Sequence, residues 1–250
     1  MDKDKRILDV CLTPALIENF DTDDTIMVII DVVRASSTIC TAFYYGADEI
    51  IPVADKEKAL SYKQEGYLIA GERNGEKLEG FDMGNSPFEF MSPDLEAKKI
   101  AITTTNGTQN IEKVSKHLGK NSEIVIGAFV NHKVLLNYLR NAGKNILLVC
   151  SGWKGNVSIE DTIFAGKLIE DLNRFNQYNY SSDAANHARL IYNQAKEDIF
   201  GFIMDQSMRF RDKISLLGND IRYCLKEDAT NAIPVLVEGK FINKQEAAGN

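Results

Sequence analysis

The chain has 250 residues, of which 44% are hydrophobic and 26% charged, and 29 Lys and Arg stand against 36 Asp and Glu for a formal net charge of −7. These proportions are typical of a globular protein that builds a core without disulfide or metal staples, and they exclude disordered, collagen-like and coiled-coil chains. The acidic balance argues against a nucleic-acid partner, which needs clustered positive charge, so any anionic ligand would depend on local side chains.

The four cysteines are scattered and form no CxxC pair, so neither a disulfide framework nor a zinc site is predicted. The N-terminal stretch MDKDKRILDV lacks the apolar segment of a signal peptide. No run of about 18 apolar residues is present to span a membrane. We therefore expect a cytoplasmic protein without a membrane partner.

Short apolar runs rich in β-branched residues alternate with helix-like segments from residue 6 to residue 173. Several runs are apolar almost throughout, as in strands that are buried on both faces of a sheet. The expected strands are residues 6–12, 25–32, 49–53, 67–70, 99–104, 123–129 and 145–150, and the expected helices are residues 35–45, 56–64, 108–118, 132–141 and 158–173.

The C-terminal third has a different pattern. Residues 181–225 are mostly helix-like, residues 232–242 are expected to form a late strand or hairpin, and residues 246–250 a frayed tail. No linker, repeat or low-complexity tract divides the chain. The sequence therefore predicts a single α/β domain over residues 1–245, with a three-layer α/β/α architecture, a mainly parallel or mixed sheet and a helical elaboration near the C-terminus.

Polar residues that directly follow predicted strands are the candidate site residues, because ligands of parallel α/β sheets bind beyond the carboxyl ends of the strands. The first cluster, DVVRASS, follows IMVII. Asp31 can hold a cation, Arg34 offers a planar fork to a phosphate or carboxylate, and Ser36 lies near a helix N-terminus, which favours anions. A simple N-cap would explain Asp31 or Ser36 but not the arginine.

The second cluster follows YLIA and begins with Glu72 and Arg73. A long polar loop comes next and carries Asp82, Asn85 and Ser86. Long polar loops inside compact domains are often functional. The alternative is a solvated loop in which Ser86 merely caps the helix that begins at the following proline.

The third cluster, TTTNGT, follows KKIAI and contains Thr104, Thr105, Asn106, Gly107 and Thr108. A strand-to-helix turn of this kind has free backbone N–H groups that can bind an oxyanion. Asn-Gly alone would make the turn, so the hydroxyl groups exceed what the turn requires. The alternative is that the threonines simply favour the strand.

The fourth and fifth clusters lie later in the chain. Glu160 and Asp161 follow CSGW and open a predicted helix, where they suit either the helix dipole and a capping box or a Mg²⁺ ion. The segment Gly218–Asn219–Asp220 on its own predicts only a turn.

Five stretches carry a family resemblance because they occur together and in one order. They are IDVVRASSTICTAFYYGA, GERNGEKLEGFDMGNSP, TTTNGT, CSGWKGNVSIEDTIFAGKLI and LGNDIRYC, and they run from about residue 28 to residue 224. With these stretches the chain resembles the 2-phosphosulfolactate phosphatase (ComB) family. The resemblance implies an α/β/α homodimer that uses Mg²⁺ to hydrolyse (R)-2-phospho-3-sulfolactate to sulfolactate and phosphate, a step of coenzyme M biosynthesis.

The residues and the resemblance together suggest roles for the clusters. We expect Asp31, with Glu160 or Asp161, to hold Mg²⁺, and Asp31, Glu72 and Asp82 to act in catalysis. The expected phosphate ligands are Arg34, Ser36, Thr104, Thr105, Asn106, Gly107 and Thr108, and the expected ligands of the sulfonate or carboxylate are Arg73, Asn85 and Ser86.

Two alternatives to this function stay open. One is a phosphatase for another phosphorylated hydroxy acid, and the other is a non-catalytic anion-binding homologue. Direct attack by water and a phospho-enzyme intermediate are both compatible with the sequence.

Overall fold

A mixed sheet of eleven strands forms the centre of the structure, a computed structural model that describes residues 5–180 and 182–244. The tail expected over residues 246–250 lies outside these residues. In spatial order the strands are β5 (Glu76–Lys77), β4 (Leu68–Arg73), β6 (Lys99–Thr103), β3 (Glu49–Pro52), β11 (Lys240–Asn243), β10 (Pro234–Val237), β7 (Glu123–Gly127), β2 (Thr25–Ile30), β8 (Asn145–Cys150), β1 (Arg6–Cys11) and β9 (Tyr178–Tyr180).

The sheet consists of two parallel halves joined by a C-terminal hairpin. Strands β4, β6 and β3 are parallel to one another, as are β7, β2, β8, β1 and β9. The hairpin β10–β11 lies between the halves and is antiparallel to both neighbours, with Val235 opposite Val125 and Phe241 opposite Ile50. A segment at the end of the chain therefore closes a sheet that the preceding residues leave in two parts.

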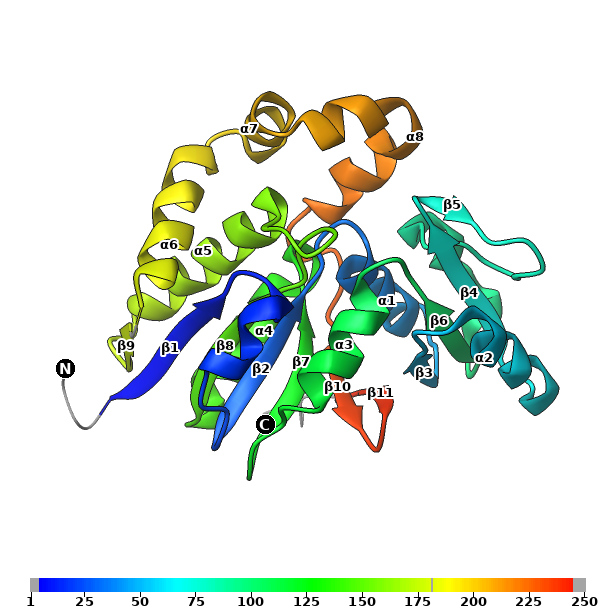
Figure 1. The fold of residues 1–250 in the computed structure, drawn as a ribbon, viewed down its shortest axis with the longest axis horizontal. Coiled ribbons are helices and arrows are strands. Elements are labelled where there is room, and N and C mark those ends of the chain that lie inside the picture. Colours follow the sequence, from blue (N-terminus) through cyan, green and yellow to red (C-terminus); the bar gives the residue numbers. More distant parts are fainter. Residues whose placement is uncertain (1–4, 181, 245–250) are drawn as a thin grey trace.

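The helices pack on both faces of this sheet and above the carboxyl ends of its strands (Figure 1). The α-helices are α1 (Ala35–Tyr44), α2 (Lys56–Ser61), α3 (Gly107–Ser115), α4 (His132–Ala142), α5 (Ile159–Asn173), α6 (Asp183–Ala195), α7 (Ile199–Gln206) and α8 (Met208–Cys224). Short 3-10 helices are η1 (Pro14–Asn19), η2 (Tyr62–Glu65), η3 (Pro87–Phe90), η4 (Pro93–Leu95) and η5 (Phe129–Asn131). No helix in the described part of the chain is both long and apolar enough to cross a membrane.

Strand β2 shows why three layers form. All of its residues are buried, and alternate side chains point to opposite faces. Val28 packs in a core with α4 and α5, whereas Met27 packs in a second core with α1 and α3. Both faces of the strand are thus covered by helices, which accounts for its continuous apolar sequence.

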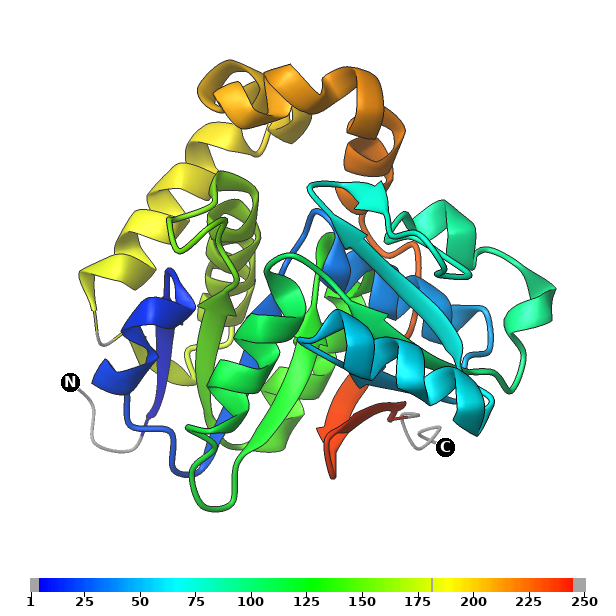
Figure 2. The same ribbon diagram turned by 45° about the vertical axis from the view of Figure 1, so that its right-hand side comes forward.

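The helical elaboration α6–α8 forms an arch over the carboxyl ends of the strands (Figures 1 and 2). It begins next to β9, and its last helix, α8, reaches the β4–β5 hairpin on the opposite side of the molecule. There a Cβ atom built on Gly75 would lie 3.6 Å from Leu216 and 3.9 Å from Leu217. The arch brings helix α8 over the space that the predicted site clusters surround.

The structure confirms the predicted fold class, with small changes at the element ends. The 67–70 strand runs further, as β4, because β5 pairs with its end. Strands β5 and β9, of two and three residues, were not predicted, since so short a run carries no measurable alternation. The turn expected at Gly218–Asn219–Asp220 is wrong, because these residues lie inside α8 and the neighbouring periodic apolar residues continue the helix through them.

Candidate functional site

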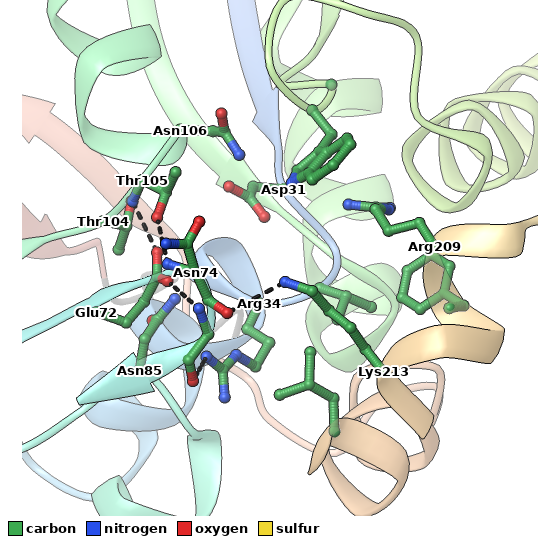
Figure 3. A pocket seen from close by; sticks show the side chains of 16 residues that line it. Asp31, Arg34, Glu72, Asn74, Asn85, Thr104, Thr105, Asn106, Arg209 and Lys213 are labelled. Carbon is green, nitrogen blue, oxygen red and sulfur yellow. Dashed lines mark hydrogen bonds between the residues drawn. The ribbon is translucent and has the colours of Figure 1, made fainter. Parts of the chain in front are cut away.

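A cavity of about 70 Å³ lies between the carboxyl ends of the strands and helix α8 (Figure 3). Five parts of the chain form its wall: the loop after β2, the β4–β5 hairpin, the segment before η3 that carries Asn85, the turn after β6 and the loop after β8. Helix α8 supplies the remaining side. The space exceeds what one water molecule requires, and most of the lining side chains are polar.

Asp31, directly after β2, is the carboxylate at the centre of this wall (Figure 3). Its Oδ1 accepts a 3.4 Å hydrogen bond from the backbone N–H of Ala35, the first residue of α1. A Cβ atom on Gly107, the first residue of α3, would lie 2.9 Å from Asp31 Oδ2. The carboxylate therefore lies at the N-termini of two helices, and only glycine lets α3 come this close.

Burial and, after it, the negative charge of Glu160 raise the pKa of Asp31 to about 7. Burial together with the charge of Glu160 also raises the pKa of Asp161 well above its ordinary range. The two effects have one origin, since three carboxylic acids share a poorly solvated region. A cation bound among them would reverse this effect by favouring the charged forms.

Asp161 and Glu160, side by side at the start of α5, have different surroundings. Asp161 accepts hydrogen bonds from the backbone N–H groups of Val32 at 2.9 Å and Gly152 at 3.0 Å, so it joins the loops that follow β2 and β8. Glu160 is paired through Oε1 with Arg209, while its buried Oε2 has no hydrogen-bond partner among the residues that the structure describes. Asp161 thus positions the backbone, and Glu160 retains one free acceptor.

Arg34 is held in the wall by helix α8 and by the β4–β5 hairpin. Its Nη1 donates to Asp220 of α8 at 2.6 Å, and its Nη2 donates to the carbonyl oxygen of Gly75 at 2.9 Å. Asp220 also accepts a 2.7 Å bond from the Ser86 hydroxyl. Because Arg34 and Asp220 are each 7% exposed, this is a buried ion pair that fixes α8 against the β4–β5 hairpin.

Glu72 connects the hairpin to the threonine turn. Its Oε1 accepts from the backbone N–H of Thr105 at 2.7 Å, and its Oε2 accepts from the backbone N–H of Gly75 at 2.6 Å. The turn is also closed on itself, since the N–H of Thr104 donates to the Thr108 hydroxyl and the N–H of Thr108 to the Thr104 hydroxyl, both at 3.2 Å. These bonds fix the backbone at the start of α3.

Helix α8 places two cationic side chains on the cavity, Arg209 and Lys213 (Figure 3). Arg209 donates to the Ser158 hydroxyl at 3.2 Å and lies over the ring of Trp153, 5.5 Å from its centre. The Lys213 ammonium donates to the carbonyl oxygen of Asn74 at 3.1 Å. No sequence pattern marks either residue, because basic side chains in a helical segment are usual on solvated faces.

The structure brings only part of the predicted site together. Asp31, Arg34, Glu72, Asn85, Thr104, Thr105 and Asn106 line the cavity, and Gly107 and Thr108 are buried in the first turn of α3 beside it. The residues that line it without having been given a role are Val33, Asn74, Gly75, Gly152, Trp153, Arg209, Phe210, Lys213 and Leu217.

Other predicted residues do not line the cavity. Arg73 donates to the carbonyl oxygen of Glu72 and to the Thr103 hydroxyl. The hydroxyl of Ser36, in the first turn of α1, accepts from the backbone N–H of Asp31 and donates to the carbonyl oxygen of Ile29 in β2. Ser86, Glu160 and Asp161 act from behind the wall through the contacts given above.

Asp82 is the predicted catalytic residue that lies furthest from this arrangement. It accepts from the backbone N–H of Ile69 at 2.9 Å and is paired with Lys63 at 3.1 Å. Against the effect of burial, these two donors lower the pKa of Asp82. A carboxylate that is ionised and paired at the surface has little tendency to exchange a proton with a ligand in the cavity.

The carboxylates offer an incomplete set of metal ligands. The oxygen atoms of Asp31, Glu160 and Asp161 do not come within 4.8 Å of one another as a trio. Within residues 5–180 and 182–244, only His132, Glu227 and Asp228 bring three such ligand atoms this close, and they do not line the cavity. The cavity-facing Asp31 and the unpartnered Oε2 of Glu160 nevertheless suit Mg²⁺, which typically takes one or two carboxylates and completes its shell with water and substrate phosphate.

The fold and the cavity define an α/β protein with a polar cavity at the carboxyl ends of its strands, where carboxylate and cationic side chains meet. A family model described as 2-phosphosulpholactate phosphatase matches residues 11–239. The chain belongs to this family of phosphoric monoester hydrolases.

Similar proteins carry the same description. A probable 2-phosphosulfolactate phosphatase of Thermotoga maritima is 42% identical over 219 residues, which cover 87% of this chain and 92% of the relative. Similar proteins of that description from Caldanaerobacter subterraneus and Clostridium beijerinckii are 33% and 34% identical. The alignments cover 92% and 86% of this chain and 95% and 90% of the respective relatives.

Proposed function

We propose that this chain hydrolyses (R)-2-phospho-3-sulfolactate to sulfolactate and phosphate in a Mg²⁺-dependent reaction at the cavity described above. The description of the family and of its relatives supports the substrate. The observation that carries the site is the position of Asp31, whose carboxylate lies at the N-termini of α1 and α3 beside Arg34.

The start of α3 suits the phosphate group. Asn106, its N-cap residue, makes no side-chain capping bond in the described part of the chain. Within the described residues, the backbone N–H groups of Asn106 and Gly107 donate no hydrogen bond. Free N–H groups at a helix N-terminus bind phosphate oxygens well, and Glu72 and the Thr104–Thr108 bonds hold this backbone in place before a ligand arrives.

The cationic side chains complete the electrostatic environment. In the reaction the bond from phosphorus to the substrate C2 oxygen breaks, a bond to a water-derived oxygen forms, and the C2 oxygen takes up a proton. Negative charge on the phosphoryl oxygens must be stabilised throughout. Arg34, fixed by Asp220 and Gly75, presents its guanidinium to the cavity without needing to reorganise.

Asp31, and Glu160 through Oε2, would hold the metal ion. Mg²⁺ would supply charge neutralisation and orient the oxygen nucleophile. Without a cation the buried charges of Asp31, Glu160 and Asp161 repel one another. Binding of Mg²⁺ would remove this repulsion, and it would account for the presence of several carboxylates at a site for an anionic substrate.

The experiment is phosphate release from (R)-2-phospho-3-sulfolactate, 2-phospholactate, 2-phosphoglycerate and 3-phosphoglycerate, each with Mg²⁺ and with a chelator. We expect the largest kcat/KM for the sulfonated ester and loss of turnover in the chelator. A larger kcat/KM for one of the other esters would replace the substrate and keep the chemistry. If none of them releases phosphate but sulfolactate raises the Tm, the chain is a binding protein and the proposed function is wrong.

The expectations of a homodimer, a cytoplasmic location and a step in coenzyme M biosynthesis belong to the same proposal. They are tested by sedimentation of the purified chain, by fractionation of the source cells and by the sulfonate content of cells that lack the gene. Each can fail without changing the assignment of the cavity.

A further inference from the structure

We propose that Lys213 and Arg209 of α8 bind the sulfonate group of the substrate and thereby determine which phosphate esters the site accepts. The inference rests on the proposed function and goes further, since it assigns the recognition of the second acid group. It also replaces Arg73, which the sequence suggested for this role and which does not line the cavity.

The first argument is the position of the two residues. They are four residues apart in α8, so their side chains project from the same face of the helix one turn apart. Figure 3 shows them on one side of the cavity and Thr104, Thr105 and Asn106 on the other. A ligand whose phosphate contacts the start of α3 therefore extends its other end toward α8.

The second argument is the charge of Lys213. Its ammonium donates to the carbonyl oxygen of Asn74, and no carboxylate lies within ion-pair distance of it in the described ranges of the chain. An ammonium has three N–H donors, so two stay available. Of the three basic side chains of the cavity, Arg34 and Arg209 are paired with acids, and Lys213 is the one that is not.

The third argument is the rigidity of Arg209. Its Nη2 donates to Glu160 and to Ser158, and its guanidinium lies over the rings of Trp153 and Phe210 at 5.5 and 4.3 Å. Its other donor nitrogens form no hydrogen bond within the part of the chain that the structure describes. The side chain is thus held at the cavity with donors to spare, as a preorganised anion site requires.

The chemistry of the pair suits a sulfonate. A sulfonate carries a full negative charge at neutral pH and three equivalent acceptor oxygens. A lysine provides a point charge that needs no particular orientation, and a fixed arginine adds directed N–H donors. A substrate without this group would leave Lys213 without an anionic partner inside the cavity, so the pair penalises such substrates as well as favouring the sulfonated one.

The test is the ratio of kcat/KM for 2-phosphosulfolactate to that for 2-phospholactate, which has the same phosphate and carboxylate but no sulfonate. We expect Lys213→Met to lower this ratio about 10–100-fold, the usual effect of losing a charge-assisted contact. Arg209→Met should lower it similarly, and Arg209→Lys should restore part of it. Because both rates come from one preparation, any loss of folded protein cancels in the ratio.

Lys226→Met is the matched control. Lys226 is exposed and follows α8, and its substitution changes the net charge by the same amount as Lys213→Met. It should keep the wild-type ratio. If Lys213→Met and Arg209→Met lower both kcat/KM values equally, the pair binds the phosphate or the carboxylate, and the inference is overturned.

A second measurement keeps the inference testable if the wild type releases no phosphate. Calorimetric titration with 3-sulfolactate and with lactate should show tighter binding of 3-sulfolactate, and Lys213→Met should remove that difference. Equal binding of the two acids by the wild type would contradict the inference independently of turnover.

Discussion

The groups around the Asp31 carboxylate set its charge state and favour a bound cation. Its carboxylate receives the N–H of Ala35 and faces the first turn of α3, both of which favour the charged form. Burial and the charge of Glu160 act in the opposite direction and are stronger, since the pKa rises to about 7. In the metal-free protein the site is thus destabilised by its own charge.

The first prediction concerns stability against pH. The folded pKa of Asp31, about 7, lies above the ordinary value of 3.8, so the folded state binds more protons than the unfolded chain between these values. The contribution of the Asp31 carboxyl group to stability is therefore fully present below about pH 4 and is lost as the pH rises through 7. We expect Asp31→Asn to be more stable than the wild type by about 1–3 kcal/mol at about pH 8 without metal, after allowance for partial solvent screening.

Urea unfolding of the metal-free protein across this pH range checks the prediction. Asp212→Asn, at an exposed position of α8, is the control and should follow the wild type. Equal stability of Asp31→Asn and the wild type at every pH would mean that the carboxylate is well solvated, contrary to this description.

At the scale of elements, a buried ion pair fixes helix α8 against the loop after β2. Asp220 binds Arg34 at 2.6 Å and Ser86 at 2.7 Å, so three segments meet at one carboxylate. The cavity has its present shape only while α8 stays against the hairpin that carries Gly75. The stability of the fold and the shape of the cavity are therefore coupled at this contact.

The second prediction follows from that coupling. We expect Asp220→Ala to lower the free energy of unfolding by about 3–5 kcal/mol, because it leaves the buried Arg34 without its counter-ion. Asp212→Ala, on the exposed side of the same helix, should change it by less than about 0.5 kcal/mol. Urea denaturation measures both, and equal effects of the two substitutions would show that the pair contributes nothing specific.

The same elements show what the sequence could predict. Asp31, Arg34, Glu72 and the threonine turn were found because polar residues at the ends of apolar strands have no packing role to explain them. Arg209 and Lys213 could not be found in this way. Their place on the cavity depends on α8 passing over the carboxyl ends of the strands, which is a tertiary property. Asp82 is predicted wrongly as a cavity residue, because the sequence of a polar loop does not reveal which of its carboxylates faces inward.

At the scale of the whole molecule, the C-terminal hairpin joins the two parallel halves of the sheet. The sequence predicted a late strand or hairpin at residues 232–242, and the hairpin is confirmed. Its insertion between β3 and β7 could not be predicted, because pairing partners so distant in sequence leave no local pattern. Phe241 of this hairpin is fully buried in the core that contains α1 and α3.

The third prediction tests that junction. We expect Phe241→Ala to cost about 3–5 kcal/mol of stability, as for other buried phenylalanines. Ile242→Ala, at a neighbouring position that is 40% exposed, should cost less than about 1 kcal/mol. The measurement is urea unfolding followed by both fluorescence and circular dichroism. Similar costs for the two substitutions would show that the hairpin does not hold the halves together.

The central claim is that the cavity around Asp31 is the centre of a Mg²⁺-dependent phosphatase. The most direct test is the rate of phosphate release from (R)-2-phospho-3-sulfolactate by Asp31→Asn and by the wild type, at saturating Mg²⁺ and substrate. The account predicts that the wild type turns over and that the variant, although folded, is slower by about 10³-fold or more. A variant rate within tenfold of the wild-type rate would contradict it.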